Sequence, residues 1–142
     1  MAIKLGMEAK LLYKVGGQGG AGSWTVLGNT RDVTLNLEAG EADVTTRANS
    51  GWRATVATLK EASVDFEMVW DTADAGFTAI KNAFFGNDPI GFQILDETSG
   101  QGLQADFSIT NFSRNEALEE AITVSVTAKV TYSATAPSWI GG

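Results

Sequence analysis

The sequence predicts a mainly β fold, an antiparallel β-sandwich or barrel that carries a single α-helix. Large apolar residues alternate with polar ones over most of the chain, which is the period of half-buried strands. Only one stretch, residues 71–86, has apolar residues at helical spacing. A composition of 44% hydrophobic residues over a length of 142 is enough to build one core. We therefore expect one domain that covers residues 1–142.

The composition also limits the chemistry that the chain can perform. It has no cysteine and no histidine, which excludes disulfide frameworks, thiolate zinc sites and Cys or His catalytic dyads. A formal net charge of −7 argues against a sequence-reading nucleic-acid binder, because such proteins cluster Lys and Arg against phosphates. The N-terminal residues lack the apolar run of a signal peptide, and no stretch reaches the ~20 apolar residues of a membrane span. We expect synthesis in the cytoplasm and no membrane insertion.

A strand predicted at residues 10–15 runs into a glycine-rich loop. Gly17, Gly19 and Gly22 match the G-x-G-x-x-G pattern of dinucleotide-binding loops. That site requires a helix after the glycines, whereas residues 24–27, Trp-Thr-Val-Leu, favour a strand. We therefore interpret the glycines as a hairpin loop.

Residues 33–37 alternate as a second half-buried strand, after which the large apolar residues disappear. A connection of more than about 12 to 15 residues without periodicity is usually functional or disordered, so we predict a long loop over about 38–60. Trp52 stands alone in this loop with Arg47 and Arg53 beside it, a composition favoured at interface anchors. The alternative, that Trp52 pins the loop onto its own core, stays open.

Residues 63–70 form the clearest predicted strand, and the only predicted helix follows it. Val64, Phe66, Met68 and Trp70 fall on one face of the strand. Asp71 and Thr72 offer an N-cap for the helix, with Asp74 near its start. Its core-facing residues are Phe77, Ile80 and Phe84, and its end is predicted at Gly86, Asn87, Asp88 and Pro89.

Three more strands are predicted at residues 90–94, 103–109 and 122–132, the last one being the longest. Phe112 follows the second of them one residue out of phase, which indicates a β-bulge or strand end near Asn111. The polar residues 114–121 predict a connection. The final residues, 133–142, form a predicted C-terminal arm whose Trp139 is typical of a side chain that seeks a partner surface.

Asp65 and Glu67 are the strongest candidates for catalysis. They lie two apart on the wet face of a strand, hence roughly 6 to 7 Å apart, which falls within the range of paired glycosidase carboxylates. Any alternating strand with acidic outer residues produces the same spacing, so we favour a solvated acidic face. We predict no catalytic residue, no metal site and no cofactor.

The chain resembles the bacteriophage major tail tube protein family, and it is similar to inner-tube proteins of contractile injection and type VI secretion systems. The resemblance runs through an ordered set of segments: Arg31-Asp32-Val33-Thr34-Leu35, Gly40 to Arg47, Val69-Trp70-Asp71-Thr72, Leu103 to Phe112, Glu119-Glu120-Ala121 and the Ser/Thr-rich strand that ends near Tyr132.

The resemblance implies a tail-tube-like fold that assembles into hexameric rings stacked into a hollow tube within a virion tail or phage-like particle. It implies that the chain binds itself, a tape measure and a terminator protein, and that DNA passes as non-specific cargo. A long loop would reach neighbouring subunits, and we expect the predicted loop 38–60 to become ordered only against a neighbour. Our interface candidates are Arg47, Trp52, Arg53 and Trp139. Our candidates for the lumen are the wet strand faces, with Asp32, Thr34, Asn36, Asp65, Glu67, Thr123, Ser125, Thr127 and Lys129.

Three other functions stay open. A carbohydrate or cell-wall binding module would need exposed aromatics on a sheet face, whereas Phe66, Trp70 and Phe107 share the core phase. An enzyme would need a cleft around Asp65 and Glu67. A capsid-decorating or tail-terminator protein would share the fold class and stop at one ring.

Overall fold

The structure, a computed structural model, describes residues 3–141 and contains one antiparallel sheet with one α-helix. The bounds of its elements are as follows: η1 (Gly6–Glu8), β1 (Lys10–Val15), β2 (Thr25–Val26), β3 (Thr30–Asp43), η2 (Arg47–Asn49), β4 (Thr55–Val69), α1 (Ala75–Gly86), β5 (Ile90–Leu95), β6 (Gly102–Asn115), β7 (Thr123–Val130) and β8 (Ser138–Ile140). No helix among the described residues has the length and apolar character needed to cross a membrane. The predicted fold class is confirmed.

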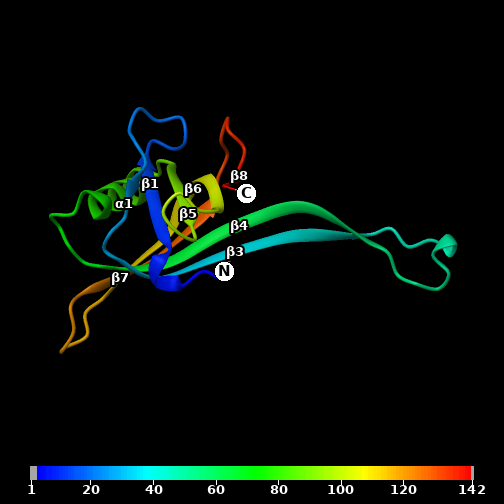
Figure 1. Cartoon of the computed structure of the whole chain (residues 1–142), viewed down its shortest axis with the longest axis horizontal. Helices are drawn as coiled ribbons and strands as arrows, with labels where there is room; N and C mark the ends of the chain where they lie inside the picture. Colours follow the sequence, from blue (N-terminus) through cyan, green and yellow to red (C-terminus); the bar gives the residue numbers. More distant parts are fainter. Residues whose placement is uncertain (1–2, 142) are drawn as a thin grey trace.

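The sheet has the strand order β2-β1-β5-β6-β7-β4-β3, and β8 pairs with β6. All of these pairings are antiparallel. Figure 1 shows that the strands curl into a body that carries α1 on one side, while the ends of β3 and β4 leave the body as a long arm. The fold is thus one curled sheet that stays open, with β2 and β3 at its edges.

The core forms where the apolar side chains on one face of β4 pack against those of the other strands and of α1. Val64, Phe66 and Met68 are each at most 4% exposed, as the predicted alternation requires. The rings of Phe66 and Phe92 meet edge to face at 5.8 Å between centroids. Partners on the other strands and on α1 include Phe77, Ile80, Phe107, Val124 and Val126. Burial of a large apolar side chain contributes about 1.5 to 3 kcal/mol, so this cluster is the main source of stability.

Helix α1 covers one end of this core. Its Phe77 packs against Trp70 at 4.7 Å between ring centroids and against Phe112 at 6.1 Å. The pairing of β6 with β7 shifts register between Ile109 and Asn111, which confirms the predicted β-bulge. The bulge turns Phe112 toward the helix, because an extra residue changes the face on which the following side chains lie.

The predicted cap of α1 needs a correction. Asp74, and neither Asp71 nor Thr72, is the N-cap, since its Oδ2 accepts a hydrogen bond from the backbone N–H of Phe77 at 2.9 Å. Asp71 closes the preceding turn by accepting from the N–H of Ala73. At the other end Asn87 adopts the left-handed conformation with φ 55°, as predicted for a residue after the last turn.

The long loop predicted at residues 38–60 is wrong over most of its length. Strand β3 continues to Asp43 and β4 begins at Thr55, so the connection is only residues 44–54. The two strands pair with each other up to Asp43 and Thr55, with register shifts between Thr30 and Val33 and between Ala39 and Glu41. Their small and polar residues give no apolar period, because a ribbon that leaves the body has no core to face.

The glycine-rich loop is a hairpin-like connection, as predicted. Gly16 and Gly17 have φ +83° and +88°, and the strand that follows, β2, is limited to two residues. A Cβ on Gly17 would lie 2.7 Å from Oδ1 of Asp106, so both backbone angle and space require glycine here.

The C-terminal part also differs from the prediction. Strand β7 ends at Val130, so Tyr132, the last residue of the strand predicted at 122–132, lies beyond it and is 92% exposed. The longest strand is β4, and the last is β8, which adds Ser138–Ile140 of the predicted arm to the edge of β6. Gly142 lies outside the described residues.

Candidate assembly surfaces

Strands β3, β4 and β7 carry one continuous polar face. Thr34 of β3 is the partner of Asp65 on β4, and Asp65 is in turn the partner of Thr127 on β7. Residues paired across antiparallel strands point to the same side, and alternation extends this side along each strand. The structure therefore brings most lumen candidates onto one surface: Thr34, Asn36, Asp65, Glu67, Ser125, Thr127 and Lys129.

Asp65 links the three strands at the centre of the polar face. Its Oδ2 accepts a hydrogen bond from Asn36 Nδ2 at 3.1 Å, and its Oδ1 accepts from Thr127 Oγ1 at 2.6 Å. Hydrogen bonds to an ionised acceptor are shorter and stronger than neutral ones, so the contacts fix this carboxylate in place. Asp65 thereby joins the side chains of β3 and β7 across β4.

The remaining lumen candidates, Asp32 and Thr123, lie at the end of this face near Val69 of β4. Asp32 and Arg31 lie in an irregularity of β3 where the pairing shifts between Thr30 and Val33, and Arg31 pairs with Glu67 at 3.5 Å. Thr123 belongs to the same face by its pairing with Val69 but is only 8% exposed. The Thr123 side chain therefore offers almost no surface to a lumen, and the residue would contribute to the lumen wall only as part of strand β7.

Two acidic residues of the polar face, Glu38 and Glu61, were not among the predicted lumen candidates. Glu38 and Glu61 are directly opposite one another on β3 and β4, in phase with Asn36 and Ser63. Like charges at such a pair are destabilising unless water or a partner screens them. Continuing the alternation from Asn36 by two residues and from Asp65 by four would have found them. They extend the acidic surface from the body onto the arm.

Neither Asp65 nor Glu67 lines the grooves described below, and both are engaged with neighbouring side chains on an open face. Among residues 3–141 no group of three His, Cys, Asp or Glu side chains is placed to hold a metal ion. The geometry of the two carboxylates is that of a solvated strand face.

Three interface candidates share the tip of the arm. We call residues 44–54 the arm tip; it contains Arg47, Trp52 and Arg53, and the Trp52 side chain is 78% exposed. The base of the tip is closed by Thr45, whose Oγ1 accepts a hydrogen bond from the N–H of Ala54 at 2.8 Å. Trp52 is neither in the core nor packed against it, which contradicts the alternative that it pins the loop there. Figure 1 shows the connection between β3 and β4 far from the body.

Hydrogen bonding gives the arm tip local order. Thr46 caps η2 by accepting from the N–H of Ala48 at 3.3 Å, and Ser50 is left-handed with φ 54°. Hydrogen bonds from the side chain and the backbone N–H of Thr45 hold the pKa of Asp43 below its usual value. The tip is therefore a closed turn that presents its Trp and Arg side chains outward.

Trp139 lies on the body, far from the arm tip. Its Nε1 donates a hydrogen bond to Gln101 Oε1 at 3.1 Å, and the residue is 56% exposed. It borders a mainly apolar groove of about 460 Å³ at the base of the arm, together with Leu37, Ala39, Ala62, Leu103, Val130 and Pro137. The four interface candidates thus form two separate surfaces.

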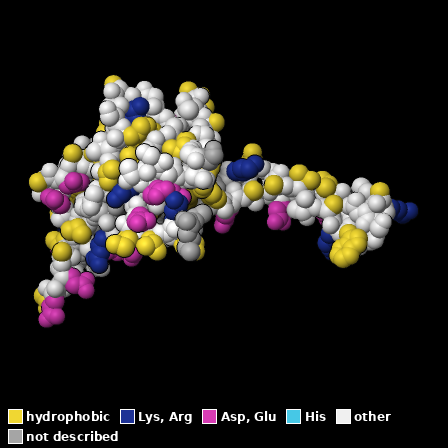
Figure 2. All heavy atoms as spheres, viewed as in Figure 1, with side chains coloured by type: hydrophobic (Ala, Val, Ile, Leu, Met, Phe, Trp, Pro, Cys, Tyr) yellow, Lys and Arg dark blue, Asp and Glu magenta, His cyan; other side chains and the backbone are white. Residues whose placement is uncertain are grey.

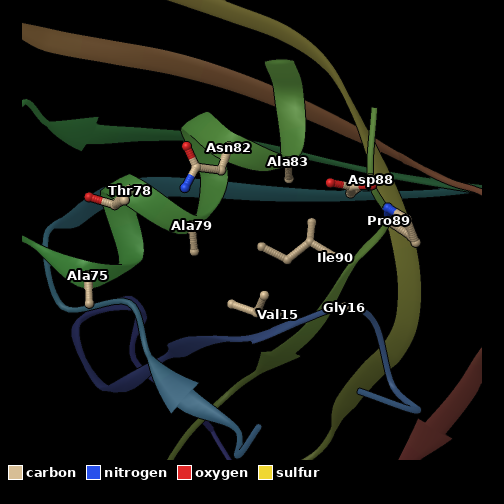
Figure 3. A pocket seen from close by; sticks show the side chains of 10 residues that line it. All are labelled: Val15, Gly16, Ala75, Thr78, Ala79, Asn82, Ala83, Asp88, Pro89 and Ile90. Atoms are coloured by element: carbon tan, nitrogen blue, oxygen red, sulfur yellow. The ribbon is translucent and has the colours of Figure 1, made fainter. Parts of the chain in front are cut away.

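A second pocket lies between α1 and the sheet edge. It has a volume of about 420 Å³, and Figure 3 shows Ala79 of the helix, Val15 of β1 and Ile90 of β5 around the same space. Val15 is 61% exposed although its strand partner Ile90 is 1% exposed. This edge of the body presents apolar surface as well.

Comparisons with known proteins agree with this geometry. A family model described as phage tail tube protein matches residues 8–135. The search of curated proteins found no match. A protein of the tail of an empty gene transfer agent particle, refined with C6 helical symmetry, is similar with a TM-score of 0.79 at 18% identity, covering 96% of this chain and 98% of that chain.

Two further solved structures share the fold. The SPP1 tail tube is similar with a TM-score of 0.77 at 16% identity, over 99% of this chain and 80% of that chain. A chain of the anti-feeding prophage baseplate is similar with a TM-score of 0.64 at 6% identity, over 99% of this chain and 97% of that chain. At these identities the likeness concerns the fold alone.

Proposed function

Since the chain belongs to the phage tail tube protein family, we propose that its copies join into hexameric rings and that these rings stack into a hollow tail tube. The role of a structural tail-tube subunit follows from the family. The hexameric ring is supported by the C6 symmetry of the similar gene transfer agent tail.

The observation that carries the ring is the open edge of the sheet. Strand β3 spans 14 residues and, among residues 3–141, pairs with β4 alone, so its other side presents N–H and C=O groups without a strand partner there. A long free edge invites pairing with another chain, and closure into a barrel removes such edges. Joining the body part of the β3 edge of one copy to the side of the sheet formed by β1 and the short β2 of the next would reduce the unpaired edges around a ring.

We propose that the polar face lines the lumen. Its carboxylates are Asp32, Glu38, Glu61, Asp65 and Glu67, against which Arg31 and Lys129 are the basic groups. An acidic wall repels phosphate, so DNA slides past without being held. The opposite face is covered by the core and by α1 and has no access to cargo.

The arm tip, with Arg47, Trp52 and Arg53, and the groove beside Trp139 are the proposed contacts between subunits. Both present large apolar side chains to solvent in the isolated chain, and exposed Trp flanked by Arg is typical of interface hot spots. Tape measure and terminator proteins remain the proposed partners at the inside and the end of the tube.

A contractile injection particle is the second candidate setting, favoured by the shared fold with the anti-feeding prophage chain. In that setting the same kind of tube would carry a cargo other than DNA. A carbohydrate-binding module is less well supported, since Phe66 and Phe107 are buried and the exposed Trp52 lies on the arm tip, away from any sheet face. We propose no catalytic role for Asp65 or Glu67.

Negative-stain microscopy and sedimentation of the purified chain test the proposal. We expect rings or rods whose amount rises with protein concentration, because assembly follows mass action. A chain that sediments as a monomer up to millimolar concentration, across salt and pH, would exclude the tube.

A further inference from the structure

We propose that the arm tip of one copy docks on the loop between β6 and β7 of a copy in the next ring. This inference rests on the proposed stacked rings and names the surface that the arm tip recognises. We call residues 116–122 the acidic loop. The contact is head-to-tail: the basic arm tip of one copy meets the acidic loop, at the opposite end of the molecule, of another copy.

The arm tip offers positive charge beside an exposed aromatic ring. Among residues 3–141, neither Arg47 nor Arg53 has a carboxylate oxygen within 4 Å. The nearby Asp43 accepts hydrogen bonds from Thr45 and so belongs to the base of the tip. Trp52 is 78% exposed between them in the sequence. The tip therefore lacks a partner for both its charge and its apolar surface.

The acidic loop offers the complementary features. It holds Glu116, Glu119 and Glu120, and its Leu118 is 99% exposed. Glu116 pairs with Arg114 at 3.3 Å, whereas Glu119 and Glu120 have no basic partner within 4 Å among the described residues. A hydrogen bond from the N–H of Glu120 to the carbonyl of Ala117, at 3.2 Å, forms a turn that presents Leu118. One apolar side chain flanked by carboxylates matches one Trp flanked by guanidinium groups.

The placement of the two surfaces favours a contact between rings. The arm tip and the acidic loop lie at opposite ends of the longest axis, and Figure 2 shows basic side chains at the arm end and acidic side chains at the other. In the proposed ring, the two sheet edges, at β2 and β3, face neighbours of the same ring. The strand ends then remain to face the rings above and below. Because the contact joins two different patches, it repeats from ring to ring without closing.

Two charge-reversed variants test the pairing. The tip variant carries Arg47→Glu and Arg53→Glu, and the loop variant carries Glu119→Arg and Glu120→Arg. All four positions are exposed, so each variant should keep the melting temperature of the wild-type monomer. We expect each variant to need about tenfold or more protein than wild type to form tubes, because like charges face one another across the contact.

Restoration distinguishes this contact from a general loss of charge. The chain with all four substitutions, and an equal mixture of the two variants, regain complementary ends and should form tubes near the wild-type concentration. A tip or loop variant that assembles like wild type overturns the proposal. So does a four-substitution chain that stays as deficient as the two variants.

Cross-linking separates this proposal from that of the tube itself, because the chain has no cysteine of its own. Ala48→Cys in the tip and Ala117→Cys in the loop, mixed as single variants, should form a disulfide-linked heterodimer even where no tube forms. A chain with both cysteines should give covalent ladders beyond the hexamer. A ladder that stops at the hexamer would place the contact within a ring and overturn the axial pairing, and absence of the heterodimer would overturn the contact. A heterodimer without tubes at any concentration would refute the tube and leave the contact standing.

Discussion

At the scale of single residues, Asp106 shows how a buried charge organises two distant segments. The residue is 6% exposed, and its Oδ1 accepts a hydrogen bond from the N–H of Gln18 at 2.5 Å, while its Oδ2 accepts from Ser133 Oγ. A buried carboxylate is tolerated only where such donors replace water. Asp106 thereby holds the glycine-rich loop against the start of the C-terminal arm.

We predict that Asp106→Asn lowers the free energy of unfolding by about 1 to 3 kcal/mol, because the amide offers one acceptor oxygen where the carboxylate offers two, so the two hydrogen bonds to a carboxylate are no longer both made. Urea denaturation of the unassembled monomer measures this free energy of unfolding. Asp88→Asn removes the same charge at an exposed position and should change stability by less than about 0.5 kcal/mol. Equal effects of the two substitutions would show that Asp106 has no special structural role.

Trp52 belongs to the residue scale as well, since it has no part in the core. We predict that Trp52→Ala weakens tube assembly by about 2 kcal/mol or more while barely moving the melting temperature of the monomer. Sedimentation gives the first quantity and thermal unfolding the second. A marked loss of monomer stability would mean that the indole side chain of Trp52 packs within its own chain and anchors no interface.

At the scale of elements, the arm is a two-stranded ribbon. Strand β4 pairs with both neighbours only over Ser63–Met68, and its first part, from Thr55, pairs with β3 alone. An isolated two-stranded hairpin is at best marginally stable in water. The arm therefore has a regular structure but little to stabilise it before a neighbour covers it.

Hydrogen exchange provides the test for the arm. We predict that amides between Gly40 and Ala57 exchange fast in the monomer and slowly in tubes, whereas amides of residues 63–69 are protected in both. The latter segment is the internal control, because it lies in the core of the same strand. Equal protection of the arm in both states would require withdrawing the proposed interface.

At the scale of the whole molecule, the curled sheet separates an apolar side from a polar one. We predict that Glu67→Lys leaves folding and tube formation nearly intact, because the Glu67 and Arg31 side chains are 36% and 59% exposed and such pairs contribute little. If the polar face lines the lumen, DNA delivery by particles with this tube should slow, since an added cation attracts phosphate. Failure of the variant to fold would instead place Glu67 in a network required for the structure.

The sequence by itself determined the strands that face the core and the family. Alternation is a local property, so the apolar residues of β4, β5 and β6 and the end of α1 at Asn87 were all visible in the chain. The resemblance to tail tube proteins, carried by segments spread over the chain, is confirmed by the family match. The bulge near Asn111 was visible because Phe112 breaks the period.

Only the tertiary structure decided what depends on partners distant in sequence. The sequence predicted a loop where the arm lies. The two strands of the arm pair with each other in solvent and cover no core, so their residues need not alternate between apolar and polar, and no strand period is visible. The cap at Asp74, the burial of Asp106 and the gathering of Glu38, Glu61 and Asp65 on one face depend on register and contacts across the sheet. Hydrophobic periodicity records which side of a strand is buried, and it holds no information on which strand lies beside it.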